Sequence, residues 1–147
     1  MSTTLHRSAE ITLRLPREHA MPLFTAEGER RWAEGWEPHY PDPTRRDGPG
    51  AVFTTAHGSH QTTWIMVDHQ PEHIRYARVT PGVTGGTVAV DVLASDGQLT
   101  RLSVTYDLTA LGPAGETWLE SFDAAYASEI ASWATDIAAA IDGRGSA

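Results

Sequence analysis

The sequence predicts an α+β domain in which a curved antiparallel sheet of six to seven strands wraps around one long C-terminal helix. Residues 7–16 alternate between apolar and polar side chains, as a strand with one buried face does. Several such runs, separated by turn signals, follow between residues 51 and 109. From Pro113 onward the apolar residues recur every three or four positions, which indicates an amphipathic helix.

Two short helices are expected after the first strand. Pro16 suits the first position of a helix, where a missing N–H is not needed, and Pro22 must shorten or kink that helix. Thr25 is placed to cap a second helix over residues 26–34, and Gly35 can end it in a left-handed conformation. The chain therefore turns back before the next strand.

Residues 37–50 are expected to form a loop, because they contain four prolines and two glycines. The loop is long enough to cover a site as a lid. His39 and Tyr40 would supply acid or base chemistry if the loop folds over a pocket. The alternative is an exposed loop pair without chemistry.

The next strands are predicted at residues 51–57, 60–69, 73–80, 87–95 and 98–109. Residues 81–86 are expected to form a turn, and the Asp96-Gly97 pair predicts a tight hairpin. In the last strand one parity is apolar and the other polar, which places a core on one side and water on the other. The apolar parity consists of Leu102, Val104, Tyr106 and Leu108.

The C-terminal helix carries an aromatic and aliphatic stripe and is expected to end at Gly143, with residues 144–147 frayed. A stripe at this period is usually core, and Trp133 is assigned to the core. The stripe consists of Trp118, Phe122, Tyr126, Ile130, Trp133, Ile137 and Ile141.

Composition narrows the possible functions. The 147 residues fit one domain over 1–147 with an ordered core at about 6–142, and the absence of cysteine excludes disulfides and thiolate chemistry. A net charge of -8 opposes binding to a phosphate backbone. No signal peptide or membrane-spanning stretch is recognisable, so a cytoplasmic protein without membrane insertion is expected, either a monomer or a homodimer.

Two histidine pairs do not make a metal site. His57 and His60 flank a tight turn without a third ligand, and His69 and His73 are separated by Pro71, so they cannot share a helix face. No nucleotide or nucleophile motif occurs either. We therefore expect no metal and no cofactor.

The order of elements and four stretches of sequence resemble the START-like (SRPBCC) superfamily, with its helix-grip fold and its polyketide cyclase and Hsp90-ATPase-activator-homologue branches. The stretches are "PLFTAEGERRWAEGWEP", "GAVFTT", "TTWIMVDHQPEHIRYARVTPG" and "VTYDLTALGPAG". The resemblance implies a cavity between the sheet and the long helix that takes up an apolar or aromatic small molecule. Such folds host diverse functions, so the chemistry must be argued from residues.

Arg78 is the most specific site candidate. It shares a strand parity with Ile74 and Tyr76; if this face is inward, a buried cation needs a carboxylate or an anionic ligand. The alternative is an exposed arginine whose aliphatic stem covers apolar surface. Asp91, on the next predicted strand, is expected to be solvated and not to pair with Arg78. Tyr106 needs a partner for its hydroxyl if it is buried.

The tryptophans near the short helices are assigned different roles. Trp32 is expected to plug the junction of helices and sheet, and Trp36, beyond Gly35, to lie at the mouth of the pocket. Arg78, Tyr106 and His39 are candidates for catalysis. The expected ligand-binding residues are Trp36, Tyr40, Phe53, Trp64, Tyr76, Arg78, Tyr106, Trp118, Phe122 and Tyr126.

Three functions are compatible with these features. The first is binding of a hydrophobic or aromatic small molecule in the cavity. The second is a cyclase or dehydratase of the polyketide type, which would need at least two polar side chains to converge in one pocket. The third is a co-chaperone-like protein-interaction module, which a large exposed apolar patch on the outer face of the sheet would favour.

Overall fold

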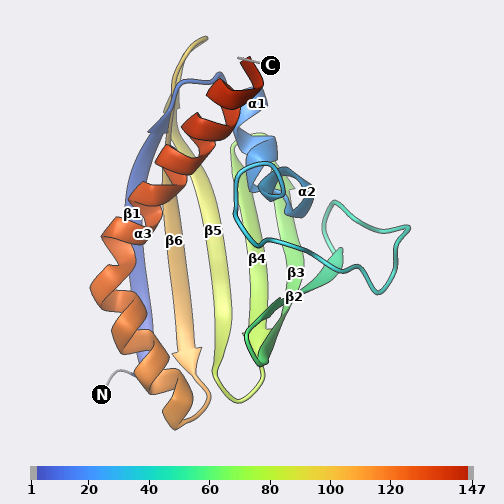
Figure 1. Ribbon diagram of the computed structural model, residues 1–147, viewed down its shortest axis with the longest axis vertical. Helices are drawn as coiled ribbons and strands as arrows, with labels where there is room; N and C mark the ends of the chain where they lie inside the picture. The colour runs from blue at the N-terminus through green and yellow to red at the C-terminus, as the bar shows by residue number, and fades with distance from the viewer. Residues whose placement is uncertain (1–2, 146–147) are drawn as a thin grey trace.

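A six-stranded antiparallel sheet and one long helix form the framework of the protein (Figure 1). The computed structural model describes residues 3–145, and the side chains of residues 3–141. The strand order is β1-β6-β5-β4-β3-β2. Strands β2 to β6 therefore form a meander, and β1 pairs with β6 at the edge opposite β2. The strands are β1 (Thr4–Leu13), β2 (Val52–His57), β3 (His60–Gln70), β4 (His73–Thr80), β5 (Thr84–Ser95) and β6 (Thr100–Ala110).

Short helices follow β1, as expected, and the first of the two expected helices is divided just before Pro22. They are α1 (Arg17–Ala20), which continues as the 3-10 helix η1 (Met21–Phe24), and α2 (Ala26–Glu29). The long helix is α3 (Pro113–Gly145). The Thr25 hydroxyl caps α2 by accepting a hydrogen bond from the Gly28 N–H at 3.0 Å. Gly35 is left-handed, with φ of 76°. However, α2 ends at Glu29, and residues 30–34 continue as turns.

Other expected boundaries also differ. β1 runs from Thr4 to Leu13, three residues earlier at each end than the strand expected over residues 7–16. Gly143 lies inside α3, and of the residues expected to fray, 146 and 147 lie outside the described part. β5 begins at Thr84, so Gly85 and Gly86 are strand residues, and a Cβ at Gly86 would meet the Asp107 carbonyl of β6. The hairpin between β5 and β6 exists, but its loop covers residues 96–99, because the Asp96 carboxylate accepts the N–H groups of Gln98 and Leu99.

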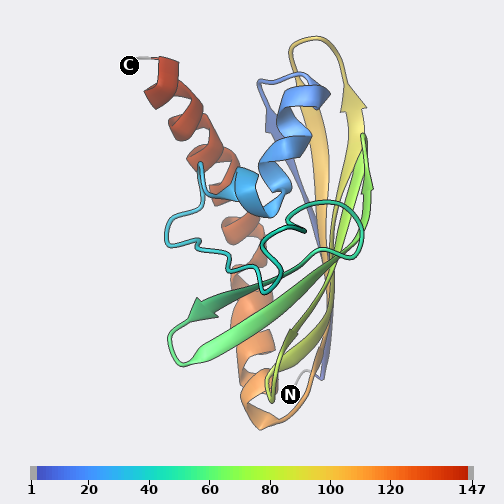
Figure 2. The ribbon, with the colours of Figure 1, turned by 90° about the vertical axis from the view of Figure 1, so that its right-hand side faces the viewer.

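The sheet curves around one side of α3. Contacts of α3 with the sheet are concentrated on β1 and β6. Figure 2 shows β2 and β3 projecting from the rest of the sheet toward the side on which α3 lies. The short helices and the loop over residues 37–50 also lie on this side (Figures 1 and 2). They cover the part of the concave face that α3 leaves free.

The core follows the predicted parity. On β6 the residues Leu102, Val104 and Leu108 are fully buried and Tyr106 is nearly so. On α3, Tyr126, Ile130 and Ile137 are buried, together with Leu119, which the expected stripe omits. Each fully buried side chain of this size contributes about 1.5–3 kcal/mol relative to an exposed one.

Trp32 plugs the junction of helices and sheet, as expected. It is 8% exposed, and its indole N–H donates to the Leu23 carbonyl at 2.8 Å. Its ring packs against Phe24 and against Trp133 of α3, with centroids 6.0 and 5.6 Å away. Trp133 thereby belongs to the core, although part of its surface meets solvent.

Within the described part of the chain, α3 and the shorter helices all lack the length of apolar sequence needed to cross a membrane.

Candidate functional site

A cavity of about 410 Å³ lies between α3, the far strands of the sheet and the segment that follows α2. Its deep wall consists of buried or half-buried residues from β3, β4, the β4–β5 turn and the start of α3: Thr62, Trp64, Arg78, Thr80, Val83, Thr84 and Trp118. Its rim consists of exposed residues, namely Glu34, Gly35, Ala56, His57, His60 and Glu129, while Ala33, Trp36 and Thr55 lie between. The exposed rim opens the cavity to solvent.

Arg78 is the charged group on the deep wall. Its guanidinium lies over the ring of Trp64, 4.8 Å from the centroid, and 5.8 Å from the centroid of Trp118. One of its terminal nitrogens donates a long hydrogen bond of 3.4 Å to the Thr80 hydroxyl. Its Nε is the buried side-chain polar atom that lacks a partner among the described residues. Burial lowers the pKa of Arg78, partly offset by Tyr106.

Strand pairing explains why Arg78 faces inward. Ile74, Tyr76 and Arg78 lie on one parity of β4, and Ile74 and Tyr76 are buried at 0% and 5% exposure. Arg78 pairs with Trp64 on β3 and with Gly86 on β5. Because Gly86 has no side chain, Trp64 is the cross-strand side chain beside the guanidinium, and Trp118 approaches it from α3. The inward alternative is therefore confirmed, and the exposed arginine is wrong.

An aromatic wall supports the cavity beside Arg78. Trp64 stacks on Phe53 with centroids 5.8 Å apart and planes 4° apart, and its indole N–H donates to Thr55 at 3.0 Å. Trp36 meets both rings edge-on at 5.9 and 5.7 Å, and its N–H donates to the Ala26 carbonyl at 2.8 Å. Trp36 lines the cavity next to the rim, as predicted, whereas Phe53 is a buried support behind Trp64.

The helix side contributes one ring directly. Trp118 lines the cavity and stacks on Phe122 with centroids 4.7 Å apart. Phe122 in turn packs edge-on against Tyr106 at 5.0 Å. Phe122 is therefore a support behind Trp118. Tyr126 is fully buried, and its hydroxyl donates to the Val104 carbonyl at 2.7 Å, so it is a core residue and does not reach the cavity.

A second, much smaller space of about 20 Å³ lies deeper, on the other side of Trp64. Tyr76 and Tyr106 line it together with Glu29, a residue that our sequence analysis does not select. The Tyr76 hydroxyl donates to the Phe24 carbonyl at 2.9 Å, and burial raises the pKa of both tyrosines. Two expected site residues thus converge here, separated from the larger cavity by the Trp64 ring.

Glu29 is a candidate functional residue that the sequence patterns do not predict. It is the last residue of α2, and although part of the residue meets solvent, its carboxyl lies over this inner space. Burial raises the pKa of Glu29 well above its ordinary value. Glu27, two residues earlier, has a lowered pKa because its carboxylate accepts a hydrogen bond from Tyr40 and pairs with Arg30. A helix-start pattern cannot distinguish these two acids.

His39 and Tyr40 do not reach the cavity. The His39 backbone forms a bridge with Thr54, with N–H to carbonyl distances of 2.8 Å in both directions, and its side chain is exposed. Tyr40 is buried against Phe53 and donates to Glu27 at 2.5 Å. Both line a separate open groove with prolines of the loop. The loop therefore forms an outer wall and does not close over Arg78.

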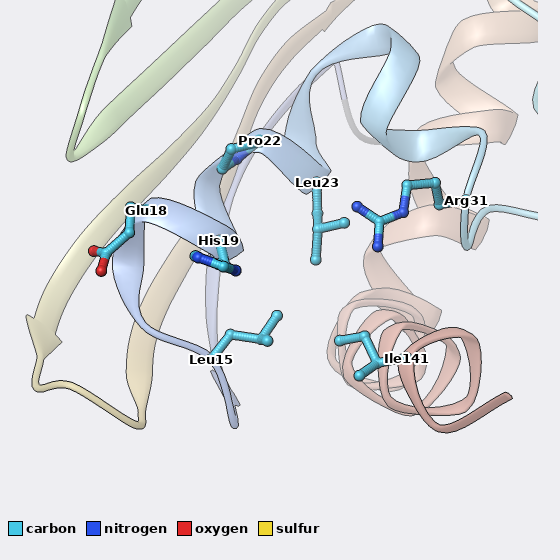
Figure 3. A pocket seen from close by; sticks show the side chains of 7 residues that line it. All are labelled: Leu15, Glu18, His19, Pro22, Leu23, Arg31 and Ile141. Atoms are coloured by element: carbon cyan, nitrogen blue, oxygen red, sulfur yellow. The ribbon is translucent and has the colours of Figure 1, made fainter. Parts of the chain in front are cut away.

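A further depression of about 410 Å³ lies at the opposite end of the molecule. Figure 3 shows Leu23 and Arg31 across from Leu15 and Ile141, with Glu18 and His19 beside them. Its charged and polar residues are exposed, and none has a buried group without a partner. We regard the Arg78 cavity as the site because it alone of these two encloses a buried charge.

The outer face of the sheet offers little to a partner. Ile65, Val67, Val79 and Leu93 are 38–44% exposed there. Each of these side chains is still more than half covered, and apolar atoms make up much of any protein surface. Asp91 also lies on this face, but it is paired with His73 Nδ1 at 2.5 Å, so its expected solvation is incomplete. Across residues 3–141, we find no three acidic or histidine side chains grouped as metal ligands.

Comparison with known proteins identifies solved structures of similar fold. No protein-family model and no curated protein matches the chain by sequence. Among solved structures, the Mll3558 protein from Rhizobium loti is similar, with a TM-score of 0.62, 18% identity and coverage of 95% of this chain and 99% of that one. Norcoclaurine synthase from Thalictrum flavum, in complex with dopamine and hydroxybenzaldehyde, gives a TM-score of 0.61 at 9% identity over 81% and 76% of the chains.

The Aha1 dimer from Colwellia psychrerythraea is also similar, with a TM-score of 0.53, 11% identity and coverage of 69% of this chain and 75% of that one. At such identities the likeness concerns the fold alone. The chain has the helix-grip fold of START-like (SRPBCC) proteins, as the sequence predicts.

Proposed function

We propose that the protein binds an aromatic or otherwise flat apolar small molecule in the cavity walled by Trp36, Trp64 and Trp118. The single observation that carries this proposal is the exposure of three indole rings to one space of about 410 Å³. Ligand pockets in proteins typically span ~300–1,000 Å³ and are lined by aromatic groups with a few polar ones.

The cavity's size and opening support this role. If it were sealed and dry, a space of 410 Å³ would cost about 10 kcal/mol at ~24 cal/mol per Å³, comparable with the whole stability of a domain. The exposed rim residues open it to solvent instead. A flat apolar molecule would displace water from the indole faces and gain hydrophobic free energy. The complex of the similarly folded norcoclaurine synthase with two aromatic molecules is consistent with this proposal.

Obstructing the entrance tests the proposal. Glu129 on α3 is exposed and lines the cavity, whereas the neighbouring Ser128 is exposed and does not line it. Glu129→Trp should weaken binding of 2-acetonaphthone, a flat neutral probe, at least tenfold, and Ser128→Trp should leave it unchanged. Tryptophan fluorescence or calorimetry would measure both. Equal binding by the two variants would place the ligand elsewhere.

A reaction in the same region is the second candidate, and Glu29 is the observation that favours it. A carboxyl with a raised pKa is suited to take a proton from carbon near neutral pH. Tyr106 and Arg78 are near enough to each other to interact electrostatically and would stabilise an enolate oxygen. The substrate would have to displace the Trp64 ring, which separates the two spaces.

Proton exchange tests this second candidate. The methyl protons of 2-acetonaphthone should exchange with D₂O faster in the presence of the protein, as followed by proton NMR. Glu29→Gln should abolish the acceleration, and Glu34→Gln, a substitution at the exposed rim, should not. No acceleration by the wild-type protein would exclude enolisation of this probe.

A further inference from the structure

The guanidinium of Arg78 leaves part of its hydrogen-bonding capacity unused inside the cavity. An arginine carries five N–H donors, and here the one side-chain acceptor found is the Thr80 hydroxyl at 3.4 Å, beyond the ordinary range for a strong bond. Its Nε is buried and has no partner within the described part of the chain. A buried donor of this kind costs free energy until an acceptor reaches it.

No carboxylate among the described side chains neutralises this charge. The ion pairs found between described side chains involve other residues, and Arg78 is absent from them. Two acidic residues line the cavity, but Glu34 and Glu129 are exposed at its rim and neither lies within ion-pair distance of the guanidinium. Tyr106 is the residue whose charge state interacts with it, and burial keeps that phenol neutral at physiological pH.

The indole rings contact the guanidinium but do not accept its N–H hydrogen bonds. Trp64 and Trp118 contact the guanidinium through their π faces, an arrangement that favours a positive charge. Neither ring accepts a hydrogen bond in the plane of the guanidinium. That plane is where a carboxylate binds an arginine with two parallel hydrogen bonds.

We propose that the ligand of this cavity is an aromatic acid, whose carboxylate binds Arg78 while its ring system lies against Trp36, Trp64 and Trp118. This inference rests on the proposed binding function and adds the charge of the ligand to it. A neutral aromatic molecule would leave the positive charge without a counter-charge, and an aromatic amine would bring a second cation beside the first. The cavity should therefore rank ligands by charge as well as by shape.

Three probes of nearly equal shape test the ranking on the wild-type protein: 2-naphthoate, neutral 2-acetonaphthone and cationic 2-naphthylmethylamine. Calorimetry at constant ionic strength should give 2-naphthoate an affinity about tenfold to a hundredfold higher than the ketone, as expected for hydrogen bonds to a charged group. The amine should bind more weakly than the ketone. An equal affinity for acid and ketone would overturn the inference.

Arg78→Met assigns the preference to one residue, with Arg75→Met as the matched control, because Arg75 is exposed on the opposite parity of the same strand. Arg78→Met should erase the advantage of 2-naphthoate while retaining the ketone, and Arg75→Met should change neither. Retention of the preference in Arg78→Met would overturn the inference. If the wild type binds none of the three probes, the proposed binding function itself fails; binding of the ketone without a preference for the acid refutes the inference alone.

Discussion

Glu29→Gln is expected to stabilise the protein, and the gain should grow with pH. In the folded protein the Glu29 carboxyl lies over the interior, and burial raises its pKa well above the ordinary value of 4.5. The folded state therefore holds a proton that the unfolded state releases over the pH range between the two pKa values. The stability conferred by this group is complete below pH 4.5 and is lost as the pH rises through the folded pKa.

The slope is fixed by proton linkage. One extra proton bound by the folded state lowers the free energy of unfolding by about 1.4 kcal/mol per pH unit between the two pKa values. Glutamine keeps the shape of the side chain and cannot ionise. The difference in stability between Glu29→Gln and wild type should thus rise by about 1.4 kcal/mol per pH unit from pH 4.5 upward, then level off.

Urea unfolding at half-unit steps between pH 5 and pH 8, followed by far-UV circular dichroism, measures this difference. Other ionisable groups are common to both proteins and cancel in the difference. Glu34→Gln is the control, since Glu34 is exposed and should give a flat profile. A flat profile for Glu29→Gln would show that the carboxylate turns out to water on ionisation, which would refute our description of its environment.

Two further pairs of substitutions test the framework around the cavity by chemical denaturation. Gly115→Ala should destabilise the protein by about 1–3 kcal/mol, because its Cβ would meet the Val83 carbonyl in the β4–β5 turn. Gly97→Ala is the control: its Cβ meets nothing within 4 Å, so its stability should be within about 0.5 kcal/mol of wild type. Equal effects of the two substitutions would contradict the close approach at Gly115. The hydroxyls of Thr62 and Thr80 are hydrogen-bonded to each other at 2.6 Å in a buried site. Thr80→Val should therefore lower the free energy of unfolding by about 1–3 kcal/mol, and adding Thr62→Val should recover part of that loss. Additive losses in the double variant would contradict the pairing.

The fold was predictable because its signals are local. The alternation on β6 and the period of α3 each specify an element and its buried face within a short stretch of sequence. Leu119 was not predicted because the first turns of the expected stripe followed the aromatic residues, whereas the buried face of α3 also includes this aliphatic position beside Trp118. The boundary of α2 escaped because Arg30 and Arg31 already bond at turn spacing.

The site was only half predictable. The parity of β4 groups Arg78 with Tyr76, but which parity is inward depends on α3 and on the neighbouring strands, outside any local window. Glu29 depends even more on distant residues, because the inner space it faces is completed by Tyr106 and Trp133. His39 failed as a candidate for a similar reason: its backbone bridge to Thr54 of β2 fixes the loop with that side chain outward.

The long helix packs mainly on β1 and β6, at one end of the strand order, while much of the cavity wall comes from β2, β3 and the chain just after α2. The packing of α3 and the proposed ligand contacts thus come largely from different stretches of the sequence. Replacements within residues 33–36 or 55–64 can alter what fits the cavity without disturbing the packing of α3 on its two strands. If the proposed binding function holds, a library confined to those stretches should yield proteins of this shape with altered ligand preference.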